Sequence, residues 1–561
     1  MWSLPFFTKK DFKIKPNVLV VLDGFGIAPP SGGNPITLAK KPNLDKYFST
    51  YPNTELIASG ESVGLPTSEV GNTEVGHLTL GAGRTIFQDL KRINYAIEKG
   101  TFYDNKALVA VSNHVKSHNS RLHILGLTSS GNVHASLEHV FALLQFCKKE
   151  QLSRVFLHLF TDGRDAPPKE GIETIEKIEE HLSLLKLGQV ASISGRFYAM
   201  DRDKRWPRTE KAYKAIVLGE AIQTQSARDA VNSAYARGQT DEFIEPTVIA
   251  DTNGAIGKVM DNDGVIFANY RIDRPRQMAM AFTLPDFESL KKFDFGDADK
   301  HSASSNDSKV GTTFVRGKVP TNMFVVTMTE YVKGLPVSGV AYGPEIVDRP
   351  FGMVLSDNGL SQMHMSESEK ERFVTYYFNG LRDASFPNEE VNIVPSPKVE
   401  TYDKRPEMSA EKLCSEFLRE LRRDKFHFIV INFANCDMVA HSGNLPATVK
   451  AIEVVDKQVG RLFEAVLAQN GTVFLTADHG NAEDLITFPS TAYFFTTNKG
   501  TINTDHSSNP VPFLIVNKEF EAKKPNLMKG TLADVAPTIL AHMGVTIPEV
   551  MTGRNLLTVG K

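Results

Sequence analysis

The sequence predicts an α/β protein made of two α/β domains, one of which is inserted into the chain of the other. A chain of 561 residues is long for a single hydrophobic core, so two domains are expected. Short apolar runs of strand length alternate with amphipathic helical patterns. Several of these runs end in acidic, basic or imidazole side chains, as at the ligand-binding edge of an open α/β sheet.

Composition argues against several classes of protein. The net charge of −3 and the charged fraction of 23% are ordinary, so neither nucleic acid nor a membrane is an expected partner. No apolar run reaches the roughly 18 residues that a membrane span requires. The three cysteines are far apart and fit a reducing compartment, so a cytoplasmic protein is expected. No glycine-rich nucleotide fingerprint follows a strand, so no nucleotide cofactor is expected.

The first strand is expected at Val18–Leu22, after a loose N-terminal extension over residues 1–16. It ends in Asp23, which glycines follow. This carboxylate is either a ligand at the edge of the sheet or a residue that favours a β-turn. A short helix is expected over Asn43–Phe48.

A glycine-rich stretch, GNTEVGHLTLGAGR from residue 71 to 84, lets the backbone crowd against a ligand. Thr73 lies in its tightest part. A hydroxyl there becomes a nucleophile only if a base or a metal lowers its pKa. The alternative is a threonine that caps a helix. His77 lies nearby, and the sequence assigns it nothing beyond an open alternative, a supporting position behind the residues that hold a ligand.

Strands and helices alternate from about Gln88. The expected strands are Leu122–Leu127, Val155–Phe160, Val190–Ile193 and Val265–Ala268. The last three lead into segments that contain arginines, and such segments meet in one crevice. Because guanidinium groups bind carboxylate and phosphate, a small doubly anionic ligand is indicated, although scattered arginines are usually surface residues. The candidates are His134, Arg164, Asp165, Arg196, Arg202, Arg271 and Arg274.

Two segments interrupt this pattern. Gly296–Lys309 is polar and low in complexity, which indicates a surface insertion. Gly334–Pro350 is rich in glycine and proline, which indicates a linker. Aromatic and β-branched residues at Phe373–Phe378 then favour a strand. Lys370, just before it, has the pattern of one more exposed lysine in a charge run.

Carboxylates and imidazoles follow the later strands. Asp437 and His441 come after a strand expected at Phe426–Asn432. If the segment is helical, their spacing of four places both side chains on one face, where they can hold one ion.

A second strand, Thr472–Leu475, ends in Asp478 and His479, and His506 stands just before another. Mixed carboxylate and imidazole ligands suit Mn²⁺, Co²⁺, Zn²⁺ or Fe²⁺ better than Ca²⁺ or Cu⁺. The set is too large for one small ion, and two ions can clamp a phosphoryl group and activate an oxygen nucleophile. Its members are Asp23, Thr73, Asp437, His441, Asp478, His479 and His506.

Seven motifs carry a family resemblance: VLDGFG, GNTEVGHLTLGAGR, TDGRDAPP, GRFYAMDRDKRW, NFANCDMVAHSG, TADHGNAE and HSSNPVPF. Through them the chain resembles the cofactor-independent phosphoglycerate mutases of the alkaline phosphatase superfamily, from Val18 to about Leu557. The resemblance implies an alkaline-phosphatase-like metal domain, residues 17–87 and 346–561. A substrate-binding domain, residues 88–345, would be inserted into it, with linkers near residue 88 and at 334–350.

The resemblance implies a glycolytic isomerase that interconverts 3-phosphoglycerate and 2-phosphoglycerate through a phosphoenzyme on Thr73, without 2,3-bisphosphoglycerate. It implies a monomer whose partner is this small-molecule substrate. It also implies two divalent ions per chain, Mn²⁺ before Co²⁺, Mg²⁺ or Zn²⁺. One ion would be held by Asp437, His441 and His506, and the other by Asp23, Asp478, His479 and the Thr73 hydroxyl.

The resemblance also assigns the remaining candidates. Asp165 would be the acid–base group for the substrate hydroxyls, and Lys370 would neutralise charge on the transferring phosphoryl group. The substrate-binding positions would be His134, Arg164, Asp165, Arg196, Arg202, Arg271, Arg274 and Lys370.

The sequence departs from the family pattern at three residues and in its longer insertion at Gly296–Lys309. Thr73 stands in place of serine, and Cys436 and Ile272 each stand in place of proline. Threonine has the same hydroxyl, but its methyl group restricts χ1. Two alternatives stay open. One is a metal-dependent phosphatase or another phosphomutase of the superfamily. The other is a non-catalytic phosphoester sensor, against which the retained ligands argue.

Overall fold

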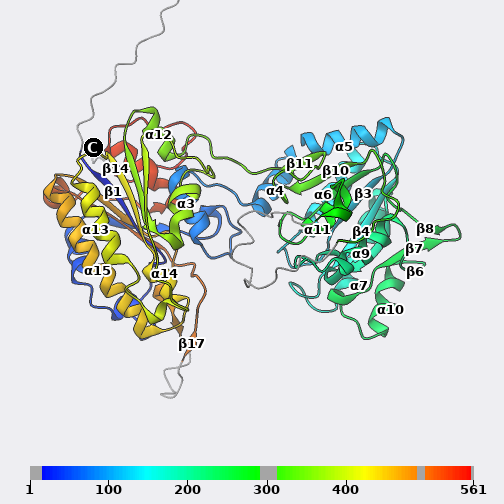
Figure 1. Ribbon diagram of the computed structural model, residues 1–561, viewed down its shortest axis with the longest axis horizontal. Helices are drawn as coiled ribbons and strands as arrows, with labels where there is room; N and C mark the ends of the chain where they lie inside the picture. The colour runs from blue at the N-terminus through cyan, green and yellow to red at the C-terminus, as the bar shows by residue number, and fades with distance from the viewer. Residues whose placement is uncertain (1–14, 291–312, 489–499, 558–561) are drawn as a thin grey trace, which may run out of the picture. The chain divides into compact units, whose positions relative to one another are not determined.

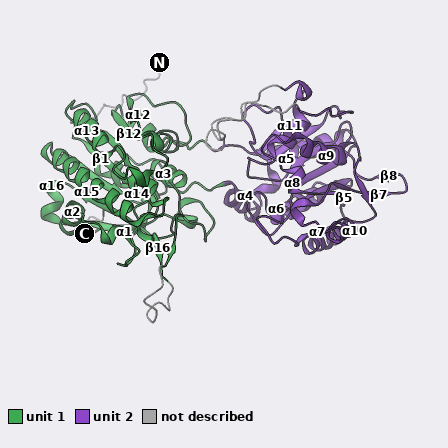
Figure 2. Ribbon diagram, turned by 60° about the horizontal axis from the view of Figure 1, so that its bottom comes forward, with its two compact units in different colours: residues 1–88, 346–561 green, residues 89–345 purple. Residues whose placement is uncertain are grey.

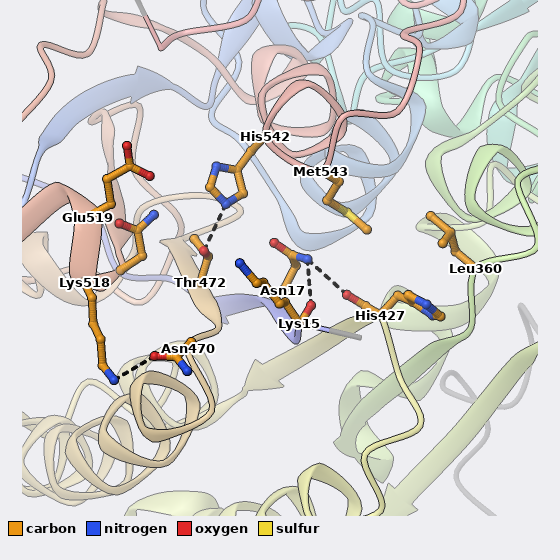
Figure 3. A pocket seen from close by; sticks show the side chains of 11 residues that line it. Lys15, Asn17, Leu360, His427, Asn470, Thr472, Lys518, Glu519, His542 and Met543 are labelled. Carbon is orange, nitrogen blue, oxygen red and sulfur yellow. Dashed lines mark hydrogen bonds between the residues drawn. The ribbon is translucent and has the colours of Figure 1, made fainter. Parts of the chain in front are cut away.

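The computed structural model describes residues 15–290, 313–488 and 500–557. The chain forms two compact units: unit 1 contains residues 1–88 and 346–561, and unit 2 contains residues 89–345 (Figures 1 and 2). Each unit combines a largely parallel sheet with helices, so the predicted α/β fold class is confirmed. Most of the expected N-terminal extension and all of the insertion at Gly296–Lys309 lie outside the described residues.

The described part of unit 1 contains an eight-stranded sheet. Its strands, in spatial order, are β13 (Glu389–Val394), β12 (Gln362–Glu367), β14 (Phe428–Phe433), β1 (Asn17–Leu22), β15 (Thr472–Thr476), β18 (Val511–Val516), β2 (Asn53–Ile57) and β19 (Gly530–Thr531). The first five are parallel, and β18 runs antiparallel to both of its neighbours. Every residue of β12, β14, β1 and β15 is buried, as in a parallel sheet covered on both faces.

Helices cover this sheet, and the longest of them, α15, packs against α13, α14 and α2 (Figure 1). The helices of unit 1 are α1 (Pro35–Leu38), α2 (Pro42–Thr50), α3 (Thr73–Ala82), α12 (Phe351–Asp357), α13 (Ala410–Leu421), α14 (Asn435–Ala440), α15 (Leu445–Ala468), α16 (Lys518–Lys523) and α17 (Val535–His542). A small hairpin pairs β16 (Ile486–Thr487) with β17 (Thr501–Ile502).

Unit 2 has its own sheet, of nine strands in the described residues. The spatial order is β11 (Gly339–Tyr342), β10 (Phe324–Thr329), β9 (Gly264–Phe267), β3 (Leu122–Leu127), β4 (Val155–Thr161), β5 (Gln189–Gly195), β7 (Thr247–Asp251) and β6 (Ile222–Thr224), with β8 (Gly254–Ala255) beside β7. The six strands from β11 to β5 are parallel, whereas β7 runs antiparallel to β5.

The helices of unit 2 connect these strands. They are α4 (Asp89–Glu98), α5 (Lys106–Ser117), α6 (Leu137–Lys149), α7 (Gly171–Leu185), α8 (Arg196–Ala199), α9 (Trp206–Val217), α10 (Ala227–Ala236) and α11 (Arg276–Thr283). The strands expected at Leu122–Leu127, Val155–Phe160, Val190–Ile193 and Val265–Ala268 are confirmed to within a few residues as β3, β4, β5 and β9. The two large apolar clusters of unit 2 contain only residues of that unit.

One local prediction was wrong, and one expected linker contains a strand. Residues Phe373–Tyr377 form a π-helical turn instead of a strand, with the Phe378 amide donating to the Phe373 carbonyl at 3.1 Å. This aromatic run packs against α3, so tertiary contacts outweigh its strand propensity. Within the expected linker, Gly339–Tyr342 forms strand β11, because pairing with β10 satisfies its backbone groups.

None of the helices in residues 15–290, 313–488 and 500–557 combines the length and the apolar character that a bilayer-spanning helix needs.

A separate core in unit 2 predicts separate folding. We expect a fragment of residues 89–345 to give a cooperative thermal transition by circular dichroism and a dispersed amide proton spectrum, because its apolar clusters are internal. The full-length chain is the control. A gradual, non-cooperative melt of the fragment would contradict the prediction.

Candidate active site

Neighbouring strands of unit 1 deliver the candidate residues to one edge of the sheet. Strands β12, β14, β1 and β15 are parallel, so their carboxyl ends meet. Asp23 follows β1, Asp437 lies in the first turn of α14 after β14, and Asp478 follows β15. Lys370 lies in the 3-10 turn after β12. The structure therefore brings residues from distant parts of the sequence to one place.

The Thr73 hydroxyl lies among these groups. Its Oγ1 is 3.0 Å from Lys370 Nζ, 3.0 Å from His479 Nε2 and 3.5 Å from Asp23 Oδ1. Thr73 is the first residue of α3, but the side chain that caps this helix is that of Asn72. The alternative of a capping threonine is therefore wrong, and the hydroxyl faces charged side chains instead.

Lys370 is buried, which contradicts the alternative of an exposed lysine. Its Nζ donates to Asp23 Oδ1 and to Asp437 Oδ2, each at 2.7 Å. Burial alone would lower the pKa of Lys370, but Asp23, Asp437 and Asp478 outweigh burial and hold this pKa above its ordinary value. The ammonium group thus stays charged and compensates the carboxylates.

Two imidazoles share one carboxylate oxygen. The Nε2 atoms of His441 and His506 lie 3.2 and 3.4 Å from Asp437 Oδ1, and 3.3 Å from each other. The helical spacing expected for Asp437 and His441 is confirmed. The Nδ1 atoms face the carbonyls of Thr504 and Gly71 at 2.8 and 2.9 Å. With Nδ1–H donating to a carbonyl, each ring presents an Nε2 lone pair, the arrangement of a metal-ligating histidine.

Three groups in the described residues have ligand atoms within 4.8 Å of one another. They are Asp437, His441 and His506; Asp23, Asp437 and His479; and Asp23, His77 and Asp478. Asp478 Oδ2 is buried and faces His77 Nδ1 at 3.2 Å and His479 Nε2 at 3.6 Å, so this carboxylate oxygen lies between two imidazoles. Carboxylates and imidazoles in such groups are the ligands that divalent first-row ions take.

The carboxylates also control the charge of His479. Burial alone would lower the pKa of His479, but Asp478, Asp23 and Asp437 outweigh burial and raise this pKa to about 10. An imidazole must lose its proton before it can ligate a metal. A proton and a metal ion therefore compete for this side chain.

Arg196 is the buried centre of the candidate cluster in unit 2. Its Nη1 lies 2.6 Å from Asp162 Oδ1 and 2.5 Å from Asp165 Oδ2. His134 Nε2 is 3.6 Å from the same Asp165 oxygen. Arg196 follows β5 and the two aspartates follow β4, so neighbouring parallel strands supply both signs of charge.

Asp273 links three of the other candidates. Its carboxylate lies 3.4 Å from His134 Nδ1, 3.2 Å from Arg271 Nε and 2.6 Å from Arg202 Nη1. Burial alone would raise the pKa of Asp273, but His134 and Arg271 outweigh burial and hold this pKa below its ordinary value. Sequence reasoning missed Asp273, although it stands between two candidate arginines in the segment RIDR.

Arg274 completes the positive side of this cluster. Burial, followed by the charges of Arg196 and Arg202, lowers the pKa of Arg274 below its ordinary value, and Arg164 adds to this repulsion. The Nε atoms of Arg196 and Arg274 are buried without a hydrogen-bond partner in the described residues. Buried, unpaired guanidinium N–H groups fit an anionic ligand.

Comparison with known proteins decides the family. The curated 2,3-bisphosphoglycerate-independent phosphoglycerate mutase of Clostridium beijerinckii is 44% identical over 543 residues, covering 97% of this chain and 99% of that protein. That of Chloroflexus aggregans is 42% identical over 546 residues, covering 97% and 98%.

The chain belongs to the family of 2,3-bisphosphoglycerate-independent phosphoglycerate mutases.

Two family profiles match parts of this mutase-family chain. The one described as "BPG-independent PGAM N-terminus" matches residues 93–333, and the one described as "Sulfatase" matches residues 313–545. A crystal structure of Leishmania mexicana phosphoglycerate mutase at low cobalt concentration has 28% identity and a TM-score of 0.58, with 98% of this chain and 99% of that chain covered. The family resemblance predicted from the sequence motifs is confirmed.

Glu483 is a further residue of this mutase-family site that sequence reasoning missed. It is a buried carboxylate that accepts from the Gly26 amide at 3.0 Å, the Asn481 amide at 2.9 Å and the Asn509 side chain at 3.1 Å. It thereby ties together the loops after β1 and β15 and the loop before β18. Glu483 is the last residue of the motif TADHGNAE, and this position could have indicated that it belongs to the site.

Lys370→Met should destabilise unit 1, because it leaves buried carboxylates without their ammonium partner. We expect a loss of about 3–5 kcal/mol in unfolding free energy, as for a broken buried ion pair. Urea denaturation in the presence of a chelator, followed by circular dichroism, measures it.

Lys529→Met is the matched control, because its ion pair with Glu55 is exposed and should contribute less than about 1 kcal/mol. Equal losses in the two variants would show that Lys370 does not compensate the carboxylates.

Proposed function

We propose that the chain interconverts 3-phosphoglycerate and 2-phosphoglycerate in glycolysis, without 2,3-bisphosphoglycerate, by carrying the phosphoryl group on Thr73. Family membership supports the reaction. The observation that carries the role of Thr73 is its hydroxyl, buried 3.0 Å from both Lys370 Nζ and His479 Nε2.

The metal ligands proposed for unit 1 form two sets. Asp437, His441 and His506 would hold one divalent ion, and Asp23, Asp478, His479 and Thr73 would hold the other. The Asp437 oxygen that His441 and His506 share, and the buried carboxylates of Asp23 and Asp478 beside His479, support this assignment. Mn²⁺ is proposed first, because it accepts mixed oxygen and imidazole ligands; Co²⁺, Mg²⁺ and Zn²⁺ are the alternatives. When bound, such ions lower the pKa of a ligating hydroxyl and neutralise phosphoryl charge.

The protein's own groups prepare Thr73 for transfer. Lys370 keeps its charge and lies beside Oγ1, where it would stabilise negative charge on an incoming phosphoryl group. Thr73 is the first residue of α3, so a phosphoryl group on it would also meet the positive end of that helix.

Unit 2 would bind the glycerate part of the substrate. Its buried, unpaired guanidinium N–H groups on Arg196 and Arg274 support binding of an anion. Asp165, between Arg196 and His134, would accept and return the proton of the substrate hydroxyls. The substrate-binding residues proposed in unit 2 are His134, Arg164, Asp165, Arg196, Arg202, Arg271 and Arg274, and Lys370 is the one proposed in unit 1.

The reaction then consists of two transfers. In the first, Thr73 Oγ1 loses its hydroxyl proton to water, the phosphoryl group leaves the 3-oxygen of the substrate and bonds to Oγ1, and Asp165 gives a proton to the 3-oxygen. In the second, Asp165 takes the proton of the 2-hydroxyl, the 2-oxygen takes the phosphoryl group from Thr73, and Oγ1 regains a proton from water. Because the same phosphoryl group returns, no external phosphate donor is consumed.

Thr73 variants test this proposal. Thr73→Val keeps the shape but lacks the hydroxyl, so 2-phosphoglycerate formation should fall roughly 10⁴-fold or more. Thr73→Ser should stay active. Turnover of 3-phosphoglycerate with added Mn²⁺ and without 2,3-bisphosphoglycerate is the measurement, with free phosphate followed in parallel.

The products separate the alternatives. Conversion to 2-phosphoglycerate with little free phosphate is the expected result for the natural chain. Release of free phosphate alone would indicate a phosphatase, and substantial turnover by Thr73→Val would remove Thr73 from the mechanism.

Metal binding should release protons. With a pKa of about 10, His479 is protonated at neutral pH and must lose its proton to ligate, so Mn²⁺ affinity should rise with pH. Calorimetric titration of metal-stripped protein in buffers of different ionisation enthalpy measures the release. Affinity that is unchanged between pH 6.5 and 8.5 would contradict the prediction.

A further inference from the structure

His77 is a fully buried imidazole in the same helix as Thr73, and the proposed chemistry gives it no part. It lies one turn after Thr73 in α3, with Nδ1 3.1 Å from the Thr73 carbonyl oxygen. The same Nδ1 is 3.2 Å from Asp478 Oδ2. On the other side of the ring, Nε2 is 3.1 Å from Asn432 Nδ2.

Asn432 extends this contact to a second carboxylate. Its Nδ2 donates to Asp23 Oδ2 at 2.7 Å and faces His77 Nε2 with its other hydrogen. An amide NH₂ only donates, so His77 Nε2 accepts and Nδ1 carries the proton. The imidazole is therefore held in one orientation, between Asp478 and the Asn432–Asp23 pair.

Helix α3 packs close to the sheet, which brings His77 within contact distance of Asp478 and Asn432. A Cβ added at Gly76 would lie 2.5 Å from the carbonyl oxygen of Asp478, so only glycine allows the helix to pack at this distance. Thr73 and His77 then meet the end of β15 from the same side of the helix.

We propose that His77 is a positioning residue, which together with Asn432 orients the carboxylates of Asp478 and Asp23 for ion binding beside Thr73. This inference deepens the proposed function and rests on it. Both ring nitrogens already face protein groups, which favours positioning over ligation by His77 itself. The partners that orient metal ligands typically change metal affinity or activity 10- to 100-fold when removed.

The test compares His77→Ala and His77→Asn with His364→Ala. His364 is a matched control, because it is also a fully buried imidazole of unit 1. It contacts the Val374 carbonyl at 2.6 Å and Gln362 Oε1 at 3.2 Å and lies outside the proposed ligand sets. Mn²⁺ affinity and stoichiometry are measured on metal-stripped protein by the resonance of free Mn²⁺, and kcat and KM are measured separately.

His77→Ala should weaken Mn²⁺ binding and lower kcat by about 10- to 100-fold each, with KM changed less than about twofold. His77→Asn can place a donor where Nδ1 stands, so it should recover part of the affinity. His364→Ala should lower the melting temperature without changing Mn²⁺ affinity.

Two results would overturn the inference. One is a His77→Ala protein that binds Mn²⁺ with the affinity of the natural chain and loses only stability. The other is the loss of one bound ion at saturating Mn²⁺, which would make His77 a ligand.

If His77→Ala does not fold, Asn432→Leu removes the same link and should weaken Mn²⁺ binding alike; unchanged affinity there would equally overturn the inference. Absence of mutase turnover in the natural chain would refute the proposed function alone, because the Mn²⁺ titration decides the role of His77 without substrate.

Discussion

Mutual repulsion of buried carboxylates is the constraint around which unit 1 is built. Asp23, Asp437 and Asp478 are all nearly inaccessible to solvent and lie at one edge of one sheet. At an effective dielectric constant of 20, two such charges 4 Å apart repel by about 4 kcal/mol. Lys370 reduces this cost by donating to two of them, and the imidazoles of the site face the same carboxylates. The same concentration of negative charge is what draws divalent cations.

In unit 2 the excess charge is positive instead of negative, and it also lies at the carboxyl ends of parallel strands. There the loops after parallel strands gather guanidinium groups, and aspartates hold them apart. Asp162 and Asp165 accept hydrogen bonds from Arg196. Asp273 forms ion pairs with Arg202 and Arg271. Burial and neighbouring positive charge lower the pKa of Arg274, so an entering anion would relieve repulsion there.

The sequence predicted structure well where the residue type alone decides the local structure, as in the apolar runs that form buried strands. Continuous apolar runs predicted the buried parallel strands, and polar residues at their ends predicted where ligands gather. The alternative of an exposed Lys370 and the strand expected at Phe373–Phe378 were wrong, because burial and packing against α3 depend on distant segments. Glu483 and Asp273 were missed for a related reason. Each stabilises loops through contacts across long sequence separations, which spacing along the chain does not reveal.

The long-range pairing of β1 has a consequence for the order of assembly. Both of its neighbours, β14 and β15, lie beyond residue 427, and the contact between Asn432 and Asp23 joins positions 409 residues apart. During synthesis from the N-terminus, β1 therefore emerges long before β14 and β15, the two strands that pair with it. All described strands of unit 2 end by Tyr342. Unit 2 can therefore form its hydrophobic core before the strands that pair with β1 have been synthesised.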